Sequence, residues 1–313
     1  MSTEALPRML DAAATRDALA YPALLEALKQ AVIELDAGRI ACPDRLVVPM
    51  AEGAMLLSMP AVAEDLASHK LITVAPANAR RGLPTIRGQV SAIDPRTGRT
   101  LLILDGPTVT GRRTAAISML ALSTLAPRPP EHILLIGTGT QAQHHLEAIE
   151  ALFPAVHLSV RGSSIASAMR FCERNAACRL ALAPDEADSG NGADAVITCT
   201  TSRQPIYFEA ARAECIVIAV GSFHADAAEV AAATVLGSAL YVDDAKGARH
   251  EAGDLILAGA DWHRVRTLAD ALRDGAPAGR PVFFKSVGCA AWDLAAARVA
   301  VSTVADGSET QST

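Results

Sequence analysis

Long apolar runs and blocks of basic residues are both missing from this chain of 313 residues. No apolar run approaches the roughly 20 residues that a membrane-spanning helix requires, so we expect no membrane partner. The formal net charge is -6 at pH 7, and a chain without a basic block has little to offer the phosphates of nucleic acid. We therefore expect a protein that acts on neither membranes nor nucleic acid.

The six cysteines also lack the patterns that carry chemistry. None forms a CxxC pair, and none has histidine partners at metal-ligand spacing, so we expect no metal site. The first residues lack the basic-then-apolar order of a secretory signal peptide. This favours a cytoplasmic protein whose cysteines are free thiols, namely Cys42, Cys172, Cys178, Cys199, Cys215 and Cys289.

Before about residue 110 the pattern predicts one helix and a mostly antiparallel sheet. Apolar residues recur at helical spacing from Leu24 to Leu35, and Gly38 then ends a helix expected over 22–37. The length of the chain allows about two domains, and this part has the pattern of a smaller α+β domain. Short β-like runs separated by turn residues supply its strands, at 45–48, 54–59, 71–75, 90–93 and 101–104.

After an alanine-rich helical pattern at 114–125 and a proline-rich break at 127–130, strands and helices alternate. This alternation predicts a Rossmann-type, doubly wound parallel sheet and an α/β fold class. The polar tail at 306–313 is expected to be disordered. The expected elements are strands at 133–136, 156–160, 179–182, 195–199, 215–220 and 240–242, helices at 141–152, 165–175 and 290–303, and a loop at 188–193.

The stretch at 132–142 joins an apolar run to a helix through a glycine turn. Gly137 permits the tight turn, Gly139 lets the backbone approach a pyrophosphate, and Ala142 lets the helix pack close to the strand. Free N–H groups at the start of the helix would then bind the phosphates. The alternative is an ordinary turn between a strand and a helix. The candidate cofactor contacts are Gly137, Thr138, Gly139, Thr140, Gln141 and Ala142.

The end of the second expected strand bears on which cofactor is bound. NAD-binding proteins usually carry an acidic residue there, which binds the ribose 2′-hydroxyl, but residues 159–164 contain none. Arg161 can instead meet a 2′-phosphate, and Ser163 can donate to it. This predicts NADPH as the preferred cofactor, with NADH as the second choice. The alternative is that Arg161 is a solvated surface residue.

Hydroxyl groups gather at the end of a later strand. Thr200, Thr201 and Ser202 follow the apolar run at 195–199, where they could line the cofactor crevice. A threonine-rich turn explains the same residues equally well.

Four basic residues before the nucleotide-binding pattern could clamp a carboxylate together, since arginine binds carboxylates through two parallel hydrogen bonds. They are Arg45, Lys70, Arg112 and Arg113. The first two are expected at strand starts, and the arginine pair at the start of the 114–125 helix. Spacing alone does not distinguish these four from ordinary surface charges.

A series of short motifs resembles the ornithine cyclodeaminase/μ-crystallin family over about residues 20–300. Each motif is weak by itself, but their number and order are specific. They are Arg45, Ser58-Met59-Pro60-Ala61, Lys70, Gly82-Leu83-Pro84-Thr85, Asp105-Gly106, Arg113-Thr114-Ala115-Ala116, Gly137 to Ala142, Thr200-Thr201-Ser202, Gly221-Ser222, Asp226 to Glu229, Gly253-Asp254 and Lys285-Ser286-Val287-Gly288.

The resemblance implies an NAD(P)-binding domain at 114–289. It also implies a substrate-binding and dimerisation domain made of 1–113 and 290–313, in a homodimer. The substrate carboxylate would be held by Arg45, Lys70 and Arg113, with Thr85 nearby. Arg113 rather than its neighbour fits because the family's arginine directly precedes Thr-Ala-Ala. Ser286, in the last motif, is implied to contact the cofactor.

Two further residues are implied to lie near the reaction centre. Asp226 matches an acidic residue of the family, and its alternative role is a helix cap. His224 stands where relatives often have a basic residue, and imidazole is a common acid-base group. The alternative for His224 is an exposed loop histidine.

The resemblance predicts an NADPH-preferring oxidoreductase that acts on the C=N bond of a cyclic imino acid. Δ1-Pyrroline-2-carboxylate would give L-proline, and Δ1-piperideine-2-carboxylate would give L-pipecolate. The alternatives are an ornithine cyclodeaminase, an alanine-type amino acid dehydrogenase, and a non-enzymatic, NADPH-dependent binding protein of μ-crystallin type. Phe223 opposes the cyclodeaminase, because cyclodeaminases resembling this chain carry an aspartate in its place.

Overall fold

The computed structural model describes residues 6–185, 192–275 and 277–309. The chain forms two compact units, of which the first combines Met1–Arg113 with Cys289–Thr313 and the second is Thr114–Gly288. Among the helices that the structure describes, none combines the length and apolar character needed to cross a membrane.

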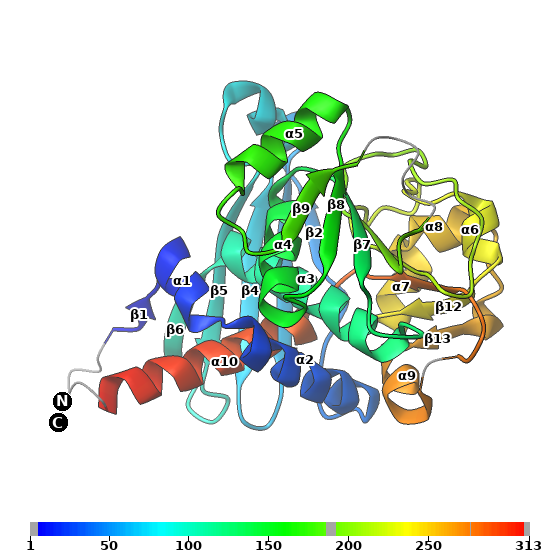
Figure 1. Ribbon diagram of the computed structural model, residues 1–313. Helices are drawn as coiled ribbons and strands as arrows, with labels where there is room; N and C mark the ends of the chain where they lie inside the picture. The colour runs from blue at the N-terminus through cyan, green and yellow to red at the C-terminus, as the bar shows by residue number, and fades with distance from the viewer. Residues whose placement is uncertain (1–5, 186–191, 276, 310–313) are drawn as a thin grey trace, which may run out of the picture. The chain divides into compact units, whose positions relative to one another are not determined.

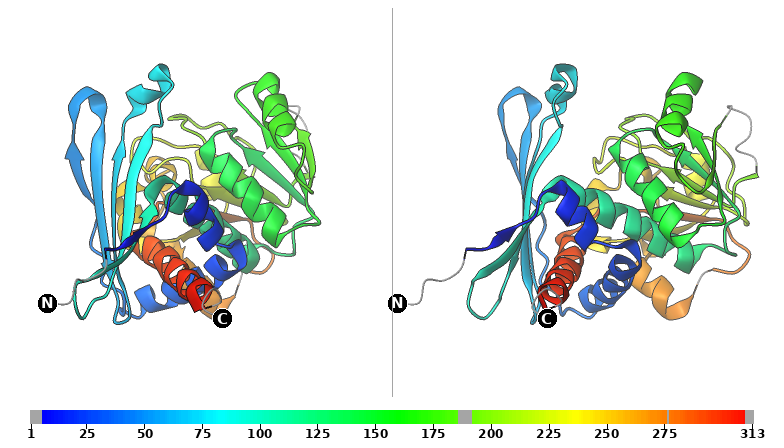
Figure 2. Two further views of the ribbon diagram at one scale, coloured as in Figure 1. Left: turned by 90° about the vertical axis from the view of Figure 1, so that its left-hand side faces the viewer. Right: turned by 60° about the vertical axis from the view of Figure 1, so that its left-hand side comes forward.

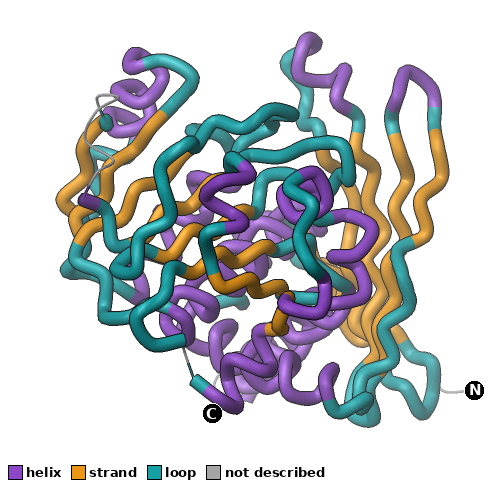
Figure 3. Tube along the Cα trace, turned by 90° about the vertical axis from the view of Figure 1, so that its right-hand side faces the viewer, coloured by secondary structure: helices purple, strands orange, loops and turns teal. Residues whose placement is uncertain are grey.

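The first unit is built on a six-stranded sheet with the order β1-β6-β5-β4-β3-β2. Neighbouring strands from β2 to β6 are antiparallel, and β1 pairs with β6 in parallel. Figure 3 shows the long strands of this sheet side by side. The strands are β1 (Arg8–Met9), β2 (Leu46–Pro49), β3 (Met55–Val62), β4 (Ala67–Val74), β5 (Ile86–Ile93) and β6 (Thr100–Asp105).

Three helices accompany this sheet, α1 (Ala12–Ala18), α2 (Tyr21–Asp36) and the C-terminal α10 (Ala290–Glu309). α10 packs across β3, β4 and β5 and also against α2, as Figure 2 shows. Its first turns are buried on all sides, because small alanine side chains let both neighbours approach closely. A helix from the end of the chain is thereby fixed against strands from its beginning.

The second unit contains an eight-stranded sheet with the order β13-β12-β14-β11-β10-β7-β8-β9, in which every neighbouring pair is parallel. This confirms the predicted Rossmann-type, doubly wound sheet (Figure 1). The strand order reverses beside β7, and the carboxyl ends of the strands at such a reversal form the usual ligand-binding edge. The strands are β7 (His132–Ile136), β8 (His157–Arg161), β9 (Ala181–Pro184), β10 (Ala195–Thr198), β11 (Ile216–Ala219), β12 (Ala239–Val242), β13 (Val265–Thr267) and β14 (Val282–Lys285).

The remaining helices connect these strands, and β10 and β11 are buried along their whole length. Their apolar side chains form a core with the helices that cover them. The helices are α3 (Gly106–Leu125), α4 (Thr140–Leu152), α5 (Ile165–Arg174), α6 (Ala232–Leu236), α7 (Ala245–Glu251), α8 (Gly253–Leu257) and α9 (Leu268–Asp274).

Three expectations about local structure are wrong. α3 begins at Gly106 rather than at 114, because the carboxylate of Asp105 accepts hydrogen bonds from the backbone N–H and hydroxyl of Thr108 at 2.9 and 2.6 Å and so caps the helix. Arg112 and Arg113 therefore lie inside α3 rather than at its start, and Lys70 lies in the middle of β4.

The expected disorder from residue 306 is also wrong, since α10 continues to Glu309. The last four residues of that tail lie outside the described residues, as does 188–191 of the predicted loop.

Candidate active site

The first unit holds a buried cluster of opposite charges. Lys70 on β4 faces Met59 of β3 and Val90 of β5 in the strand register, and it is 1% exposed. Its Nζ lies 2.8 Å from Oδ2 of Asp293, in the first turn of α10. Nε of Arg113, on α3, lies 3.3 Å from Oδ1 of the same carboxylate. One carboxylate thus holds two cations in place.

Asp293 was not among the predicted site residues, although the sequence carries a signal for it. It is a lone acid within an apolar, alanine-rich stretch, 290–297. A charged residue on such a stretch is buried at high cost unless it is paired. This pattern indicates that Asp293 needs a cationic partner. It does not indicate which of the distant basic residues is that partner.

The electrostatics bring Arg45 to the same cluster. Burial is the main cause that lowers the pKa of Lys70, to about 8, and the charges of Arg113 and Arg45 lower it further, while Asp293 opposes them. Lys70 and Arg113 share one contacting carboxylate, so this pair of cations carries an excess of positive charge. Such an excess suits a second carboxylate, supplied by a ligand.

Arg112, the fourth basic residue considered, has a different setting. Its Nε donates to the backbone oxygen of Leu19 at 2.9 Å, and its guanidinium lies 3.9 Å from the centre of the Tyr21 ring. These contacts fix α3 against the segment around α2. Arg112 therefore serves the packing of the first unit, whereas its neighbour Arg113 belongs to the charge cluster.

Thr85 is exposed and precedes β5. Its carbonyl oxygen accepts from the backbone N–H of Ala75 at 2.7 Å, whereas Lys70 is level with Val90. Five residues of extended strand correspond to roughly 16 Å. The structure does not bring Thr85 into the cluster, and its role stays a prediction.

The glycine turn of the second unit has the geometry of a phosphate-binding corner. Gly137 has a φ of +132°, and a Cβ there would lie 2.8 Å from the carbonyl oxygen of Cys199. Gly139 borders open space and precedes α4 without a side-chain cap. Buried Ala142 packs α4 against the sheet. Uncapped N–H groups beside open space fit the pyrophosphate of a dinucleotide.

The other residues of this corner differ in exposure. Thr138 is half-buried, and Thr140 is exposed at the start of α4. The side-chain oxygen of Gln141 is buried and has no hydrogen-bond partner among the described residues, which leaves it able to accept from a ligand.

An acidic residue directly after the third strand pairs with Arg161. Arg161 ends β8, and its Nε and Nη2 both lie 2.6 Å from Oδ2 of Asp185, which follows β9. Asp185 is buried, while Ser163 is exposed. The guanidinium is therefore oriented by its partner rather than freely solvated. Sequence reasoning missed Asp185 because the pairing joins two strands.

Glu229 organises the carboxyl ends of β10 and β11. Its fully buried carboxylate accepts from the backbone N–H and the hydroxyl of Thr200 at 2.7 and 2.8 Å, and from the backbone N–H of Gly221 at 2.7 Å. Thr200 is thus held by the protein itself. Thr201 is exposed, and the hydroxyl of Ser202 donates to the backbone oxygen of Gln204 at 2.6 Å, the local turn considered above.

Two more buried acids fix neighbouring segments. Asp254 accepts from the backbone N–H of Glu229 at 2.7 Å and lies 2.8 Å from Nζ of Lys285. Asp243 accepts from the hydroxyl of Ser286 at 2.7 Å. Since that hydroxyl donates its proton to Asp243, Ser286 can only accept from a cofactor. Glu229, Asp254 and Lys285 belong to the short motifs quoted for the resemblance, but the sequence alone indicated no role for them.

The two candidate acid-base residues lie in an exposed loop after β11. Asp226 forms an ion pair with Arg203, and both side chains are more than half exposed. His224 is exposed, and its ring stacks on that of Phe223 with centroids 4.5 Å apart. Within the described part of the chain, no cluster of His, Cys, Asp or Glu side chains is arranged to hold a metal ion.

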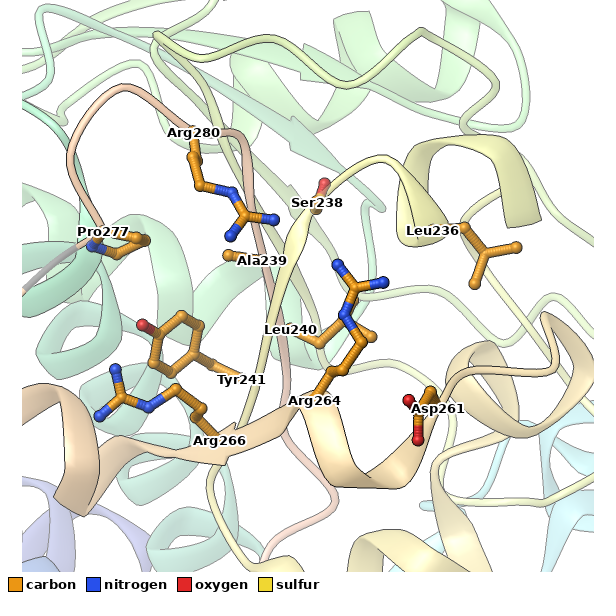
Figure 4. Close-up of a pocket in the computed structure, with 10 residues that line it drawn as sticks. All are labelled: Leu236, Ser238, Ala239, Leu240, Tyr241, Asp261, Arg264, Arg266, Pro277 and Arg280. Atoms are coloured by element: carbon orange, nitrogen blue, oxygen red, sulfur yellow. The ribbon is translucent and has the colours of Figure 1, made fainter.

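A separate pocket of about 170 Å³ contains none of the predicted site residues (Figure 4). Ser238 and Arg264 stand directly before β12 and β13, and Arg280 stands two residues before β14. The pocket therefore lies at the amino ends of these strands, whereas the Gly137 corner follows the carboxyl end of β7. In a sheet of parallel strands these are opposite edges, so this pocket is not part of the nucleotide-binding corner.

Comparison with known proteins gives close relatives along nearly the whole chain. Δ1-Pyrroline-2-carboxylate reductase 2 of Burkholderia ambifaria is 56% identical over 291 residues, which cover 93% of this chain and 94% of the relative. A Δ1-pyrroline-2-carboxylate/Δ1-piperideine-2-carboxylate reductase of Azospirillum brasilense is 54% identical over 298 residues, or 95% and 96% of the two chains. The mouse (Mus musculus) ketimine reductase mu-crystallin is 31% identical over 86% of this chain and 87% of its own.

Solved structures share the fold. The Δ1-pyrroline-2-carboxylate reductase of Thermococcus litoralis, solved with NADH and L-proline, superposes with a TM-score of 0.87 over 96% of this chain and 98% of that one, at 24% identity.

The model of the ornithine cyclodeaminase/mu-crystallin family matches residues 7–308. The resemblance inferred from the short motifs is thus confirmed, and the chain belongs to the ornithine cyclodeaminase/mu-crystallin family.

Proposed function

We propose that this protein reduces the C=N bond of cyclic imino acids. Its substrates would be Δ1-pyrroline-2-carboxylate and Δ1-piperideine-2-carboxylate, and its products L-proline and L-pipecolate. The observation that carries the proposal is the buried cluster of Lys70, Arg113 and Asp293, whose excess of positive charge suits a small carboxylate. The bacterial relatives with over half of their residues identical are named as reductases of these imines, which supports the same substrate class.

The residues divide the work between binding and orientation. When bound, a reduced nicotinamide supplies the hydride for the imine carbon. Arg45 and Arg113 bind the substrate carboxylate and fix the position of the ring, which removes part of the entropic barrier. The N–H groups around Gly137 and Gly139 bind the pyrophosphate. Thr201 and Ser286 offer oxygen atoms to the rest of the cofactor.

NADPH is the proposed preferred cofactor, with Arg161 and Ser163 at its 2′-phosphate. Arg161→Ala should weaken NADPH binding roughly 10- to 150-fold, because a hydrogen bond to a charged group contributes about 1.5–3 kcal/mol. NADH binding should stay nearly unchanged. The measurement is the ratio of the two dissociation constants by fluorescence titration, which a general loss of stability from the freed Asp185 does not alter.

Arg170→Ala provides the matched control for Arg161→Ala, since Arg170 is an exposed arginine on α5 of the same unit. It should leave both dissociation constants as they are. Equal losses of NADPH and NADH binding in Arg161→Ala would remove Arg161 from the 2′-phosphate site.

The first unit is the proposed dimerisation domain. β2 is an edge strand of the described sheet, and it exposes Leu46, Val47 and Val48 by 60%, 44% and 41%. An exposed apolar edge favours pairing with a second copy, here around a two-fold axis. Sedimentation velocity should find a dimer, and Val47→Lys should shift it toward the monomer. A wild-type chain that is active as a stable monomer would contradict this proposal.

The activity itself is tested with a small panel of substrates. NADPH oxidation is followed with each cyclic imino acid, and separately with pyruvate plus ammonia. Turnover confined to pyruvate and ammonia would favour the alanine-type dehydrogenase, and binding of NADPH without any turnover would favour the binding protein. A cytoplasmic location belongs to the same proposal and is supported by the six free cysteines.

A further inference from the structure

We propose that the pocket at the amino ends of β12, β13 and β14 binds the phosphate group of a small ligand, which Arg264 and Arg280 contact from opposite sides. The residues that line this pocket take no part in the proposed reduction. The site is therefore independent of the reductase assignment, and its occupation can be measured without turnover.

The order of the strands places the two arginines on either side of β12. β12 pairs with β13 along one edge and with β14 along the other. Arg264 directly precedes β13, and Arg280 stands two residues before β14. Neighbouring strands lie about 4.8 Å apart, so β13 and β14 are separated by roughly 10 Å. Two long side chains from these flanking strands can therefore reach one ligand at the start of β12.

Figure 4 shows how the two side chains are directed. The guanidinium groups of Arg264 and Arg280 point toward each other, with Ala239 and Leu240 of β12 between them in this view. Like charges that face each other repel, and an anion between them turns this repulsion into two attractions. The arrangement of the side chains thus favours a bound anion.

The charge of the lining also favours an anion. Arg264 and Arg280 are exposed, and neither forms an ion pair with another residue that the structure describes. The lining includes one acid, Asp261, whose carboxylate accepts from the backbone N–H of His263 at 3.0 Å. With three arginines the lining has a formal charge of +2, whereas the whole chain carries -6. A positive patch on a negative protein concentrates anions at that position.

The other polar side chains of the pocket already have partners. Arg266, the third arginine, forms an ion pair with Asp274. The hydroxyl of Ser238 donates to the backbone oxygen of Thr234 at 2.8 Å, so it has no further proton to donate. The two facing guanidinium groups are therefore the donors that a ligand can use.

A phosphate group fits these donors better than a carboxylate does. A phosphate monoester carries a charge of about -1.5 to -2 at pH 7 and has three acceptor oxygens. It therefore matches the charge of the lining, and it can accept from two guanidinium groups on opposite sides at once. A carboxylate has a single charge, and its two oxygens suit the fork of one arginine.

The size of the pocket limits the rest of the ligand. Pockets for drug-sized ligands measure about 300–1,000 Å³, so a volume of about 170 Å³ admits inorganic phosphate or a small monoester but not a dinucleotide. Leu236, Leu240 and Pro277 also line the pocket, and they can contact the carbon body of a monoester. The chemistry common to both sources is the phosphate group.

The test is calorimetric titration of the full chain with inorganic phosphate and with phenyl phosphate. Saturating NADPH and pyrrole-2-carboxylate occupy the cofactor corner and the carboxylate clamp, and sodium chloride at equal ionic strength is the reference. Two charge-assisted contacts correspond to a dissociation constant of about 1 mM or lower. Tighter binding of phenyl phosphate would identify a monoester as the occupant, and equal binding would identify inorganic phosphate.

Arg264→Ala and Arg280→Ala should each weaken phosphate binding roughly 10- to 150-fold, because each removes hydrogen bonds to a charged group. Both side chains are exposed, so the variants should fold. Arg170→Ala, which removes an exposed arginine from α5 of the same unit, should bind phosphate as the wild type does. Phosphate should also raise the Tm of the wild type, since it binds the folded state, and the double variant should lose this rise.

Unchanged phosphate binding in the double variant Arg264→Ala/Arg280→Ala would place the anion elsewhere and overturn the proposal. A rise in Tm no larger than that with chloride at the same ionic strength would do so too, because it would reflect charge screening alone. If no imine is reduced, the proposed function fails, whereas this titration still decides whether the pocket binds phosphate.

Discussion

Arg113→Ala is expected to lower kcat/KM for Δ1-pyrroline-2-carboxylate roughly 30- to 5,000-fold. Arg113 is buried and held 3.3 Å from Asp293, and truncation of one partner of the buried, hydrogen-bonded charge pair that it would form with the substrate carboxylate costs about 2–5 kcal/mol in binding. The variant lacks the contact between Arg113 and the substrate carboxylate. Asp293 keeps its contact with Lys70, so its charge is not left without a cation. Steady-state kinetics at fixed NADPH measure it.

Arg112→Ala is the matched control, since Arg112 is the next residue on the same helix. It binds the backbone oxygen of Leu19 and packs on the ring of Tyr21. Its removal should lower the Tm, whereas the folded enzyme should keep nearly its full kcat/KM. Equal kinetic losses in Arg112→Ala and Arg113→Ala would mean that Arg113 acts through packing, and the carboxylate clamp would be wrong.

L-Ornithine is expected to be cyclised with release of ammonia at least roughly 100-fold more slowly than the imine is reduced. A general acid-base group contributes about 10²–10⁴ in rate, and Phe223 cannot act as one. Its ring is half-buried and stacks on His224. Asp226, three residues on, is exposed and paired with Arg203, so it is a poor substitute for the missing acid.

Incubation with L-ornithine and NAD, followed for ammonia and proline, measures this directly. Phe223→Asp serves as the informative variant, because it introduces the acid that cyclodeaminases resembling this chain carry. It should raise ammonia release while lowering imine reduction. Wild-type ornithine turnover comparable to imine reduction would reverse the assignment in favour of the cyclodeaminase.

The nucleotide-binding corner was predictable from the sequence because its signal is local. A buried strand, the glycines Gly137 and Gly139, and the start of α4 follow one another within about ten residues. The parallel sheet was predictable for the same reason, since each unit of strand and helix is continuous in the chain. The start of α3 was not predicted, because Gly106 and Pro107 are residues that usually interrupt a helix. Proline is nevertheless well tolerated in a first helical turn.

The charge cluster was not predictable from spacing. Lys70, Arg113 and Asp293 are separated by scores of residues, and they meet because the last helix packs across β4. The resemblance predicted Lys70 and Arg113 as site residues. Asp293, the buried acid that contacts both, was identified only in the structure. The pairing of Arg161 with Asp185 was hidden in the same way, since it joins neighbouring strands 24 residues apart.

The comparison of two imines tests the central claim most directly. Reduction of Δ1-pyrroline-2-carboxylate and of Δ1-pyrroline, which has the same ring without the carboxylate, is followed as NADPH oxidation with the wild-type enzyme. A clamp made of Arg45, Lys70 and Arg113 predicts rapid reduction of the acid and a kcat/KM at least roughly 100-fold lower for the bare ring, because binding energy from the carboxylate is used to orient the C=N bond. Equal reduction of both rings, or reduction of neither, would contradict it.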